Sequence, residues 1–325
     1  MKPKVYVTRL IPEEPLKRLG QNSDYRIWDG ELPVPRDVLL REVSTVDGLL
    51  SLLTDKIDAA IMDAAHKLRV ISNMAVGFDN VDVKEATKRK IIVCNTPGVL
   101  TDTTADFAFA LLLAAARRVV EGERVVRARK WKTWGPMILL GQDVHHATLG
   151  IIGLGRIGAE VAKRARGFDM KIIYYDMVRR PDLEKKLDVE FRNLDALLAE
   201  SDFITIHCPL LPETYHLIGE EQFKIMKKTA ILVNSARGPI VDPRALHRAL
   251  HDRRILYAAL DVTEPEPIPP DDPLLTLENI VIAPHIASAS VATRTKMAMM
   301  AVENLLAAVR GERPPHIVNP EVLAK

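Results

Sequence analysis

The chain has 325 residues, which is enough for two domains that each have their own hydrophobic core. Its 47% hydrophobic and 27% charged residues are typical of a globular protein and exclude a disordered one. The 45 Lys and Arg residues face 43 Asp and Glu residues, and this net charge of +2 favours neither nucleic acid nor a membrane as a partner.

The N-terminal stretch MKPKVYVTRLIPEEP has no apolar run of the length that a signal peptide requires. The most apolar run, residues 107–116, is well short of the roughly 20 residues of a membrane span, and we expect a buried helix there. Cys94 and Cys208 are too few for a disulfide framework. These features predict a cytoplasmic protein.

Short apolar runs alternate with helical patterns along the chain, which is typical of an α/β protein with parallel sheets. In the first part we predict strands at residues 4–8, 48–52, 70–73 and 91–94. A single long helix is then predicted from about Thr103, where Thr103 and Asp106 form a rough capping box, to beyond Arg117.

A second α/β series follows. Its predicted strands are residues 148–152, 171–175, 203–207, 230–233, 258–261 and 280–283. A closing helix is predicted from about Ser290 to Arg310, ending at Gly311 with prolines beyond it. The second series is a complete doubly wound unit, whereas the first lacks a partner until the C-terminal tail returns to it.

A glycine-rich turn joins the first strand of the second series to the next helix. Gly153, Gly155 and Gly158 fit the pattern G-x-G-x-x-G at this junction. The first glycine permits a tight turn, the second lets the backbone approach a pyrophosphate, and the third lets helix and strand pack closely. The N-terminus of the helix offers N–H groups and a positive dipole end to the phosphates. The turn therefore predicts a dinucleotide site.

Asp176 ends the next predicted strand, where dinucleotide-binding units carry a carboxylate for the ribose. Such a carboxylate binds the ribose hydroxyls of NAD and repels the 2′-phosphate of NADP. Arg179 and Arg180 leave NADP open as an alternative, because either of them can bind a 2′-phosphate instead of lying in solvent. We favour NAD as the cofactor.

Three further polar residues lie at or after the ends of predicted strands. The planar guanidinium of Arg237 can hold a carboxylate and polarise an adjacent carbonyl group. His285 can transfer a proton near neutral pH, and Glu266 can orient a histidine by hydrogen bonding. Strand ends of one doubly wound sheet converge, so these residues can meet. The residues alone do not choose His285 over His207, which also ends a predicted strand.

The motifs GLGRIG, NSARGPIVD, LDVTEPEP and APHIAS, in this order, resemble those of the D-isomer-specific 2-hydroxyacid dehydrogenase family. The likeness covers nearly the whole chain, including VGFDNVD at 76–82 and TDTTADFAFALLLAAARR at 101–118. It is nearest to the glyoxylate/hydroxypyruvate reductase branch, because of SLLTDKID, AVGFDNVD and LGQDVHHATLGIIGLGRIG.

The resemblance implies two Rossmann-like doubly wound domains. The cofactor domain, residues 100–285, is inserted into a discontinuous substrate domain made of residues 1–99 and 286–325. The implied activity is NAD(P)H-dependent reduction of a small 2-oxo acid, of the glyoxylate or hydroxypyruvate type, to the D-2-hydroxy acid without a metal. A homodimer is the family expectation. Residues 131–140 are its expected contact arm, unless Trp131 and Trp134 pack on their own subunit.

The resemblance also implies individual roles. Arg237 matches the substrate-binding arginine, Glu266 the carboxylate paired with the catalytic histidine, and His285 the proton donor that also contacts the substrate. The implied cofactor contacts are Thr104, Gly153, Gly155, Arg156, Ile157, Gly158, Asp176, Pro209 and Asp261. The implied substrate contacts outside the cofactor domain are Leu53, Val76 and Gly77.

The motif LDVTEPEP departs from the family pattern. Thr263 stands where an aromatic residue is common, and the motif has two Glu-Pro pairs. Counting from Asp261 selects Glu266 over Glu264 as the partner of His285. Three alternative functions stay open: a D-3-phosphoglycerate dehydrogenase-like enzyme, a phosphite dehydrogenase-like enzyme, and a non-enzymatic, dinucleotide-sensing protein like the corepressors of this superfamily.

Overall fold

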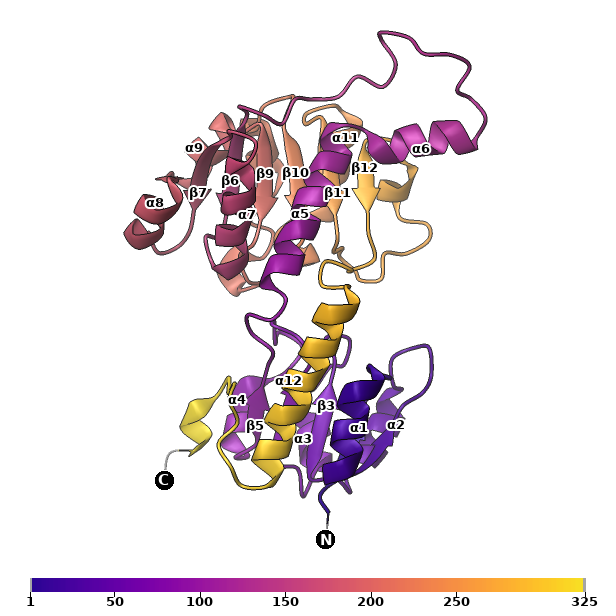
Figure 1. Cartoon of the computed structure of the whole chain (residues 1–325), viewed down its shortest axis with the longest axis vertical. Helices are drawn as coiled ribbons and strands as arrows, with labels where there is room; N and C mark the ends of the chain where they lie inside the picture. The colour runs from indigo at the N-terminus through magenta and orange to yellow at the C-terminus, as the bar shows by residue number, and fades with distance from the viewer. Residues whose placement is uncertain (1, 324–325) are drawn as a thin grey trace. The chain divides into compact units, whose positions relative to one another are not determined.

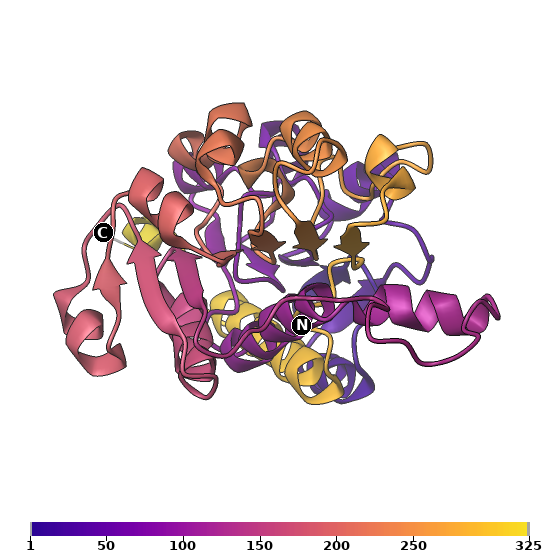
Figure 2. The same cartoon turned by 90° about the horizontal axis from the view of Figure 1, so that it is seen from above.

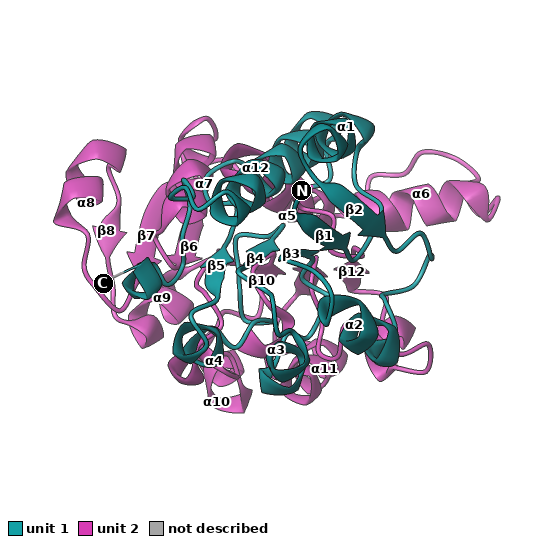
Figure 3. Ribbon diagram, turned by 90° about the horizontal axis from the view of Figure 1, so that it is seen from below, with its two compact units in different colours: residues 1–100, 289–325 teal, residues 101–288 magenta. Residues whose placement is uncertain are grey.

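The computed structural model describes residues 2–323. The chain divides into two compact units (Figure 3). The first unit combines residues 1–100 with residues 289–325, and the second unit is the continuous segment 101–288. Among the described residues, no helix has the length and apolar character to cross a membrane.

The first unit contains a parallel sheet of five strands in the order β2-β1-β3-β4-β5. Its strands are β1 (Lys4–Val7), β2 (Asp24–Ile27), β3 (Gly48–Ser51), β4 (Val70–Asn73) and β5 (Ile92–Cys94). Its helices are α1 (Glu13–Asn22), α2 (Arg36–Val43), α3 (Ala59–Ala64), α4 (Val83–Lys88) and α12 (Val291–Val309), with a 3-10 turn η4 (Pro320–Leu323). Helices α1 and α12 lie on one face of the sheet, and α2, α3 and α4 lie on the other (Figure 3).

Strand β2 was not predicted from the sequence. It is an edge strand whose residues, DYRI, alternate between exposed and half-buried positions. It therefore lacks the continuous apolar run by which a strand covered on both faces is recognised. The C-terminal tail returns to the first unit as a helix and a loop: α12 packs on β3 and β4, and Ile317 forms an isolated bridge to Cys94.

The side chain of Asn319 fixes the tail to β5. It is completely buried. Its Oδ1 accepts a hydrogen bond from the Val93 N–H at 2.8 Å, and its Nδ2 donates to the Ile91 carbonyl at 2.9 Å and to the Thr87 hydroxyl at 3.0 Å. One amide group thus satisfies two backbone groups that the sheet edge would leave without partners.

The second unit contains a seven-stranded parallel sheet in the order β12-β11-β10-β9-β6-β7-β8. Its strands are β6 (Thr148–Ile152), β7 (Lys171–Tyr175), β8 (Glu190–Phe191), β9 (Phe203–Ile206), β10 (Ile231–Asn234), β11 (Tyr257–Leu260) and β12 (Ile280–Ile282). Its helices are α5 (Thr101–Ala116), α6 (Val119–Arg127), α7 (Arg156–Arg166), α8 (Pro181–Leu187), α9 (Leu194–Glu200), α10 (Glu220–Ile225) and α11 (Pro243–His251). Three 3-10 turns are η1 (Pro212–Thr214), η2 (Gly238–Ile240) and η3 (Pro273–Thr276).

Helices cover both faces of this sheet (Figures 1 and 2). Successive strand residues point to opposite faces, so Ile151 packs with α5 and α7 while Ile152 packs with α9, α10 and α11. The chain runs outward from β6 to β8 and then returns to the other side of β6 as β9. The order of strands therefore reverses between β6 and β9, which is where ligands bind to open α/β sheets.

The single helix predicted from Thr103 to beyond Arg117 is wrong in two respects. Helix α5 begins at Thr101, so Thr103 and Asp106 lie inside it and form no capping box; Asp106 instead accepts a hydrogen bond at 2.6 Å from Arg164 of α7. The helix also ends at Ala116, because Arg118 has a left-handed backbone with φ of 51° and α6 begins after it.

We expect Asn319→Ala to destabilise the protein, because the Val93 N–H and the Ile91 carbonyl would be left buried without partners. Each such group costs about 1–3 kcal/mol of unfolding free energy. Urea denaturation followed by circular dichroism measures the loss. Glu321→Ala, an exposed neighbour in the same tail, is the control. Equal stability of both variants would contradict the role of Asn319.

Candidate active site

The glycine-rich turn lies between β6 and α7, beside the point where the strand order reverses. Gly153 has φ of +95°, and a Cβ there would lie 2.6 Å from the Cys208 backbone nitrogen. A Cβ at Gly158 would lie 2.2 Å from the Gly153 carbonyl oxygen. A Cβ at Gly155 would meet no described heavy atom within 4 Å. The outer glycines are thus required by packing, whereas the middle one keeps a space open before the N-terminus of α7.

Asp176 directly follows β7, and its Oδ2 accepts a hydrogen bond from the Leu154 N–H at 2.9 Å. Leu154 lies within the glycine-rich turn. The carboxylate is therefore fixed beside the space that Gly155 keeps open. This geometry suits a ribose next to a diphosphate.

Apart from Asp261, the remaining predicted cofactor residues lie in three places. Arg156 and Ile157 form the first turn of α7, and neither is fully buried. Pro209 is exposed in the loop after β9, where its carbonyl accepts a hydrogen bond from the Thr214 hydroxyl at 2.7 Å. Thr104 is buried in the first turn of α5.

Arg237 follows β10, and its loop is shaped by Asn234. The Asn234 side chain is buried; it donates to the Arg237 carbonyl at 2.8 Å and accepts from the Ala236 N–H at 3.0 Å. The guanidinium Nη1 donates to the Ala236 carbonyl at 2.8 Å. A Cβ at Gly238 would lie 1.9 Å from the Thr263 carbonyl oxygen, so this loop touches the loop after β11.

His285 and Glu266 form a hydrogen-bonded couple. The His285 Nδ1 lies 2.6 Å from the Glu266 Oε1, and the two side chains are only 22% and 34% exposed. Because Nδ1 is taken by the carboxylate, Nε2 is the ring nitrogen that can serve a substrate. The couple brings together residues that lie after β11 and after β12.

Asp261 holds the loop that carries His285. Its carboxylate is buried and accepts hydrogen bonds from the Ile286 N–H at 2.7 Å and the Ala287 N–H at 2.8 Å. Burial raises the pKa of Asp261, and these two N–H groups counteract the rise. The His285 N–H donates to the Asp261 carbonyl at 2.8 Å, which supports the uncommon positive φ of His285. A contact of Asp261 with the cofactor stays a prediction.

The structure distinguishes between His207 and His285, the two histidines that the residues alone left as candidates for proton transfer. The ring of His207 lies at the end of β9, and its Nε2 is 2.8 Å from the Thr205 hydroxyl. Burial lowers the pKa of His207 to about 3. The ring is therefore neutral near pH 7 and is too weak an acid to donate its remaining proton, which leaves His285 as the candidate.

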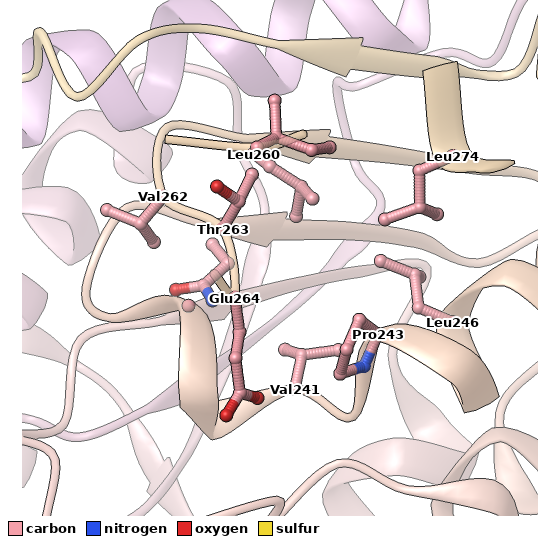
Figure 4. Close-up of a pocket in the computed structure, with 11 residues that line it drawn as sticks. Val241, Pro243, Leu246, Leu260, Val262, Thr263, Glu264 and Leu274 are labelled. Carbon is pink, nitrogen blue, oxygen red and sulfur yellow. The ribbon is translucent and has the colours of Figure 1, made fainter. Parts of the chain in front are cut away.

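Glu264 and Glu266 each face a different histidine. The Glu264 Oε2 lies 2.6 Å from the His216 Nε2, and its Oε1 accepts from the Tyr215 hydroxyl at 3.3 Å. Glu264 also borders a small apolar hollow beneath the loop, and its carboxylate points away from Leu260 and Leu274 (Figure 4). Glu264 thus contacts the loop after β9 through His216, and Glu266 is the glutamate that contacts His285.

Ser235 is a polar residue that sequence reasoning passed over. It is buried beside Arg237, and its Oγ has no hydrogen-bond partner among the described residues. A buried hydroxyl group without a partner is costly unless a bound molecule satisfies it. The space before Gly155 and the Asp176 carboxylate beside it fit a bound dinucleotide. The position of Ser235 inside the NSARG motif is the sequence feature that could have indicated it as a site residue.

In the first unit, Leu53 follows β3, and Val76 and Gly77 follow β4. The carbonyls of residues 75–77 accept hydrogen bonds from the Thr96 N–H at 2.8 Å, the Asn95 Nδ2 at 2.8 Å and the Asn73 Nδ2 at 3.1 Å, respectively. In a trans peptide the N–H points opposite to the C=O. The N–H groups that follow these carbonyls therefore point away from these three donors. A contact of Val76 and Gly77 with the substrate stays a prediction.

Comparison with known proteins identifies the family to which the chain is similar. Residues 109–287 match the family model described as "D-isomer specific 2-hydroxyacid dehydrogenase, NAD binding domain". The chain is 60% identical over 324 residues to a glyoxylate reductase of Korarchaeum cryptofilum, covering 99% of this chain and 98% of that protein.

Two solved structures are similar over nearly their full lengths. A protein of Thermus thermophilus has a TM-score of 0.92 and 46% identity, covering 97% of this chain and 99% of that one. An NADPH-dependent glyoxylate/hydroxypyruvate reductase of Sinorhizobium meliloti, in complex with NADP and malonate, has a TM-score of 0.86 and 32% identity, covering 98% of this chain and 97% of that one.

We expect Gly155→Ala and Gly158→Ala to separate cofactor binding from folding. The methyl group at position 155 meets open space, so the melting temperature should stay unchanged while the Kd of the dinucleotide rises roughly tenfold or more. The methyl group at position 158 meets backbone, so the melting temperature should fall. Fluorescence titration with NADH and thermal denaturation measure the two effects. A Gly155→Ala protein that binds normally would contradict the assignment of the open space.

Proposed function

Because the chain belongs to the D-isomer-specific 2-hydroxyacid dehydrogenase family and is an NAD(P)-dependent enzyme of that class, we propose that it reduces glyoxylate or hydroxypyruvate, with His285 as the proton donor. The observation that carries this proposal is the 2.6 Å hydrogen bond between His285 and Glu266 beside the loop of Arg237. The identity to glyoxylate reductases supports the choice of substrate class.

We propose a substrate-binding role for donors of each unit. Arg237 supplies a permanent positive charge and a planar pair of N–H groups. The N–H groups of Val76 and Gly77 supply uncharged donors, which the hydrogen bonds of their neighbouring carbonyls orient. Leu53 limits the size of the substrate in this proposal. The guanidinium also stabilises negative charge on the carbonyl oxygen as it develops.

His285 is proposed to protonate the carbonyl oxygen from Nε2. The bound dinucleotide supplies the hydride to the carbonyl carbon. The Glu266 carboxylate holds the ring through Nδ1 and stabilises its protonated form. The hydrogen bonds of Asp261 fix the backbone that carries the ring. These groups are held before the substrate binds, which lowers the cost of reaching the transition state.

NAD is the proposed preferred cofactor. The Asp176 carboxylate is fixed beside the glycine-rich turn by the Leu154 N–H, where it can accept hydrogen bonds from both ribose hydroxyls. A 2′-phosphate at the same place would meet a negative charge.

We also propose that the protein is a homodimer whose contact arm is residues 131–140. This segment belongs to the long loop that follows α6 in the second unit (Figure 1). Its apolar side chains are exposed; Trp134 and Met137 are 77% and 76% exposed, and Trp131 is 59% exposed. Neither tryptophan is packed away within its own described chain. An exposed apolar segment of this kind is typical of a protein interface.

The proposed reaction predicts that the purified protein oxidises NADH when glyoxylate is added, which absorbance at 340 nm measures. A panel with hydroxypyruvate, pyruvate and bulkier 2-oxo acids ranks the substrates. No turnover of any 2-oxo acid with either NADH or NADPH would refute the proposed function.

Two glutamates of one loop provide a matched pair of variants in the same assay. Glu266→Gln should lower kcat by roughly 10²-fold, the lower end of general acid catalysis, because His285 loses its charged partner. Glu264→Gln should change kcat by less than about threefold, because its carboxylate faces His216 instead. If the two variants lost activity equally, Glu266 would have no special role.

For the contact arm, we expect size-exclusion chromatography with light scattering to give the mass of two chains. The double variant Trp134→Glu/Met137→Glu should shift the protein towards the monomer mass of 36.3 kDa, because two charges would be buried in the interface. Val291→Glu, which alters an 88% exposed residue of the first unit, is the control. A monomeric parent protein would rule out the dimer.

A further inference from the structure

Two arginines follow Asp176 in the loop between β7 and α8, and both have acidic partners. The Arg179 Nε and Nη2 donate to the two carboxylate oxygens of Glu184, both at 2.8 Å. The Arg180 Nε and Nη2 lie 3.3 and 3.2 Å from the oxygens of Asp182. An arginine in this loop is the type of residue that accommodates the 2′-phosphate of NADP. Whether either arginine can bind a 2′-phosphate therefore depends on the acidic residue with which it pairs.

Glu184 is held in place from the protein side. Its Oε1 accepts a hydrogen bond at 2.7 Å from the hydroxyl of Tyr174, a completely buried residue of β7. The same hydroxyl accepts a hydrogen bond at 2.8 Å from the Arg180 N–H. The hydrogen bonds from Arg179 and Tyr174 lower the pKa of Glu184 to about 2. Glu184 thus stays a charged, oriented acceptor over the physiological pH range.

This ion pair holds Arg179 on the β8 side of β7. The guanidinium carbon of Arg179 lies 5.9 Å from the centre of the Phe191 ring, and Phe191 belongs to β8. The Asp176 carboxylate is tied instead to Leu154, which follows β6. Strands β6 and β8 flank β7 on opposite sides. Arg179 is therefore fixed on one side of β7, while the proposed ribose site lies on the other.

The pair of Arg180 and Asp182 is looser. The side chains of Arg180 and Asp182 are 39% and 64% exposed, and those of Arg179 and Glu184 are 62% and 17% exposed. The two pairs therefore differ in the burial of the carboxylate and not in that of the arginine. The hydrogen bonds of Arg180 are also longer than those of Arg179. Exposed pairs of this kind contribute little, because water competes for both charges. Asp182 thus offers a natural comparison for Glu184 within the same loop.

We propose that Glu184 is a specificity-determining residue that keeps Arg179 away from the 2′ position of the bound dinucleotide and so favours NAD over NADP. This inference rests on the proposed NAD preference of the same site. Asp176 repels a 2′-phosphate directly, and Glu184 acts by withholding one of the two arginines of the loop that would otherwise attract it. Glu184 is a positioning residue, because it acts through Arg179.

The test is the binding of NADH and NADPH to the full-length protein, measured by fluorescence titration without substrate. Glu184→Gln removes the charge that holds Arg179 and keeps an oxygen for the Tyr174 hydroxyl. The Kd of NADPH should fall roughly tenfold or more, the size of one charge-assisted hydrogen bond, and the Kd of NADH should stay within about twofold. The ratio of kcat/KM for the two cofactors with glyoxylate should shift in the same direction.

Two further variants make the result specific. Asp182→Asn should shift the Kd of NADPH by less than about threefold, because its ion pair is exposed. Arg179→Ala in the Glu184→Gln background should abolish the gain, because the released cation is then missing. An unchanged Kd of NADPH in Glu184→Gln, a gain that survives Arg179→Ala, or a parent protein that prefers NADPH would overturn the inference.

The titrations of NADH and NADPH also distinguish a failure of this inference from a failure of the proposed function. If Glu184→Gln gains NADPH affinity while no 2-oxo acid is reduced, the role of Glu184 stands and the proposed reaction fails. If glyoxylate is reduced and NADPH affinity does not change, the reaction stands and the role of Glu184 fails.

Discussion

The candidate site depends on the parallel order of the seven-stranded sheet, because only parallel strands bring all their carboxyl ends to one edge. Asp176, Arg237 and His285 each follow a different strand of this sheet and are far apart in the sequence. The reversal of strand order between β6 and β9 separates the loops there and leaves space beside the glycine-rich turn. The fold thus fixes where a dinucleotide can bind before any side chain is considered.

Buried polar side chains then fix the loops at this edge. Asn234 shapes the loop of Arg237, and the Asp261 carboxylate holds the backbone that follows His285. Glu264 joins the loop after β11 to His216 in the loop after β9. Each of these side chains satisfies groups that would otherwise be buried without partners, so the loops are held in one conformation. A rigid setting of this kind is what acid catalysis requires.

Near the glycine-rich turn, hydrogen-bond partners likewise hold charged side chains in place. Asp176 and Glu184 are two carboxylates near the end of β7, and we propose different roles for them because their neighbours differ. A backbone N–H of the glycine-rich turn holds Asp176, whereas Tyr174 and Arg179 surround Glu184. The same type of charged group thus faces the proposed ribose in one case and restrains a cation in the other.

The sequence determined the features that depend on local chemistry. Continuous apolar runs predicted ten of the strands, because strands of a parallel sheet are buried on both faces, and the spacing of three glycines predicted the turn after β6. The edge strands β2 and β8 were not predicted, because their partly exposed residues form no continuous apolar run.

Only the tertiary structure decided which side chains become partners. The motif LDVTEPEP contains two glutamates, and their distances to His216 and His285 assign one to each histidine. The burial that keeps His207 neutral and the network around Glu184 likewise arise from residues distant in sequence or on neighbouring elements. Hydrogen bonding and desolvation act over a few ångströms of space, and a linear sequence does not contain those distances.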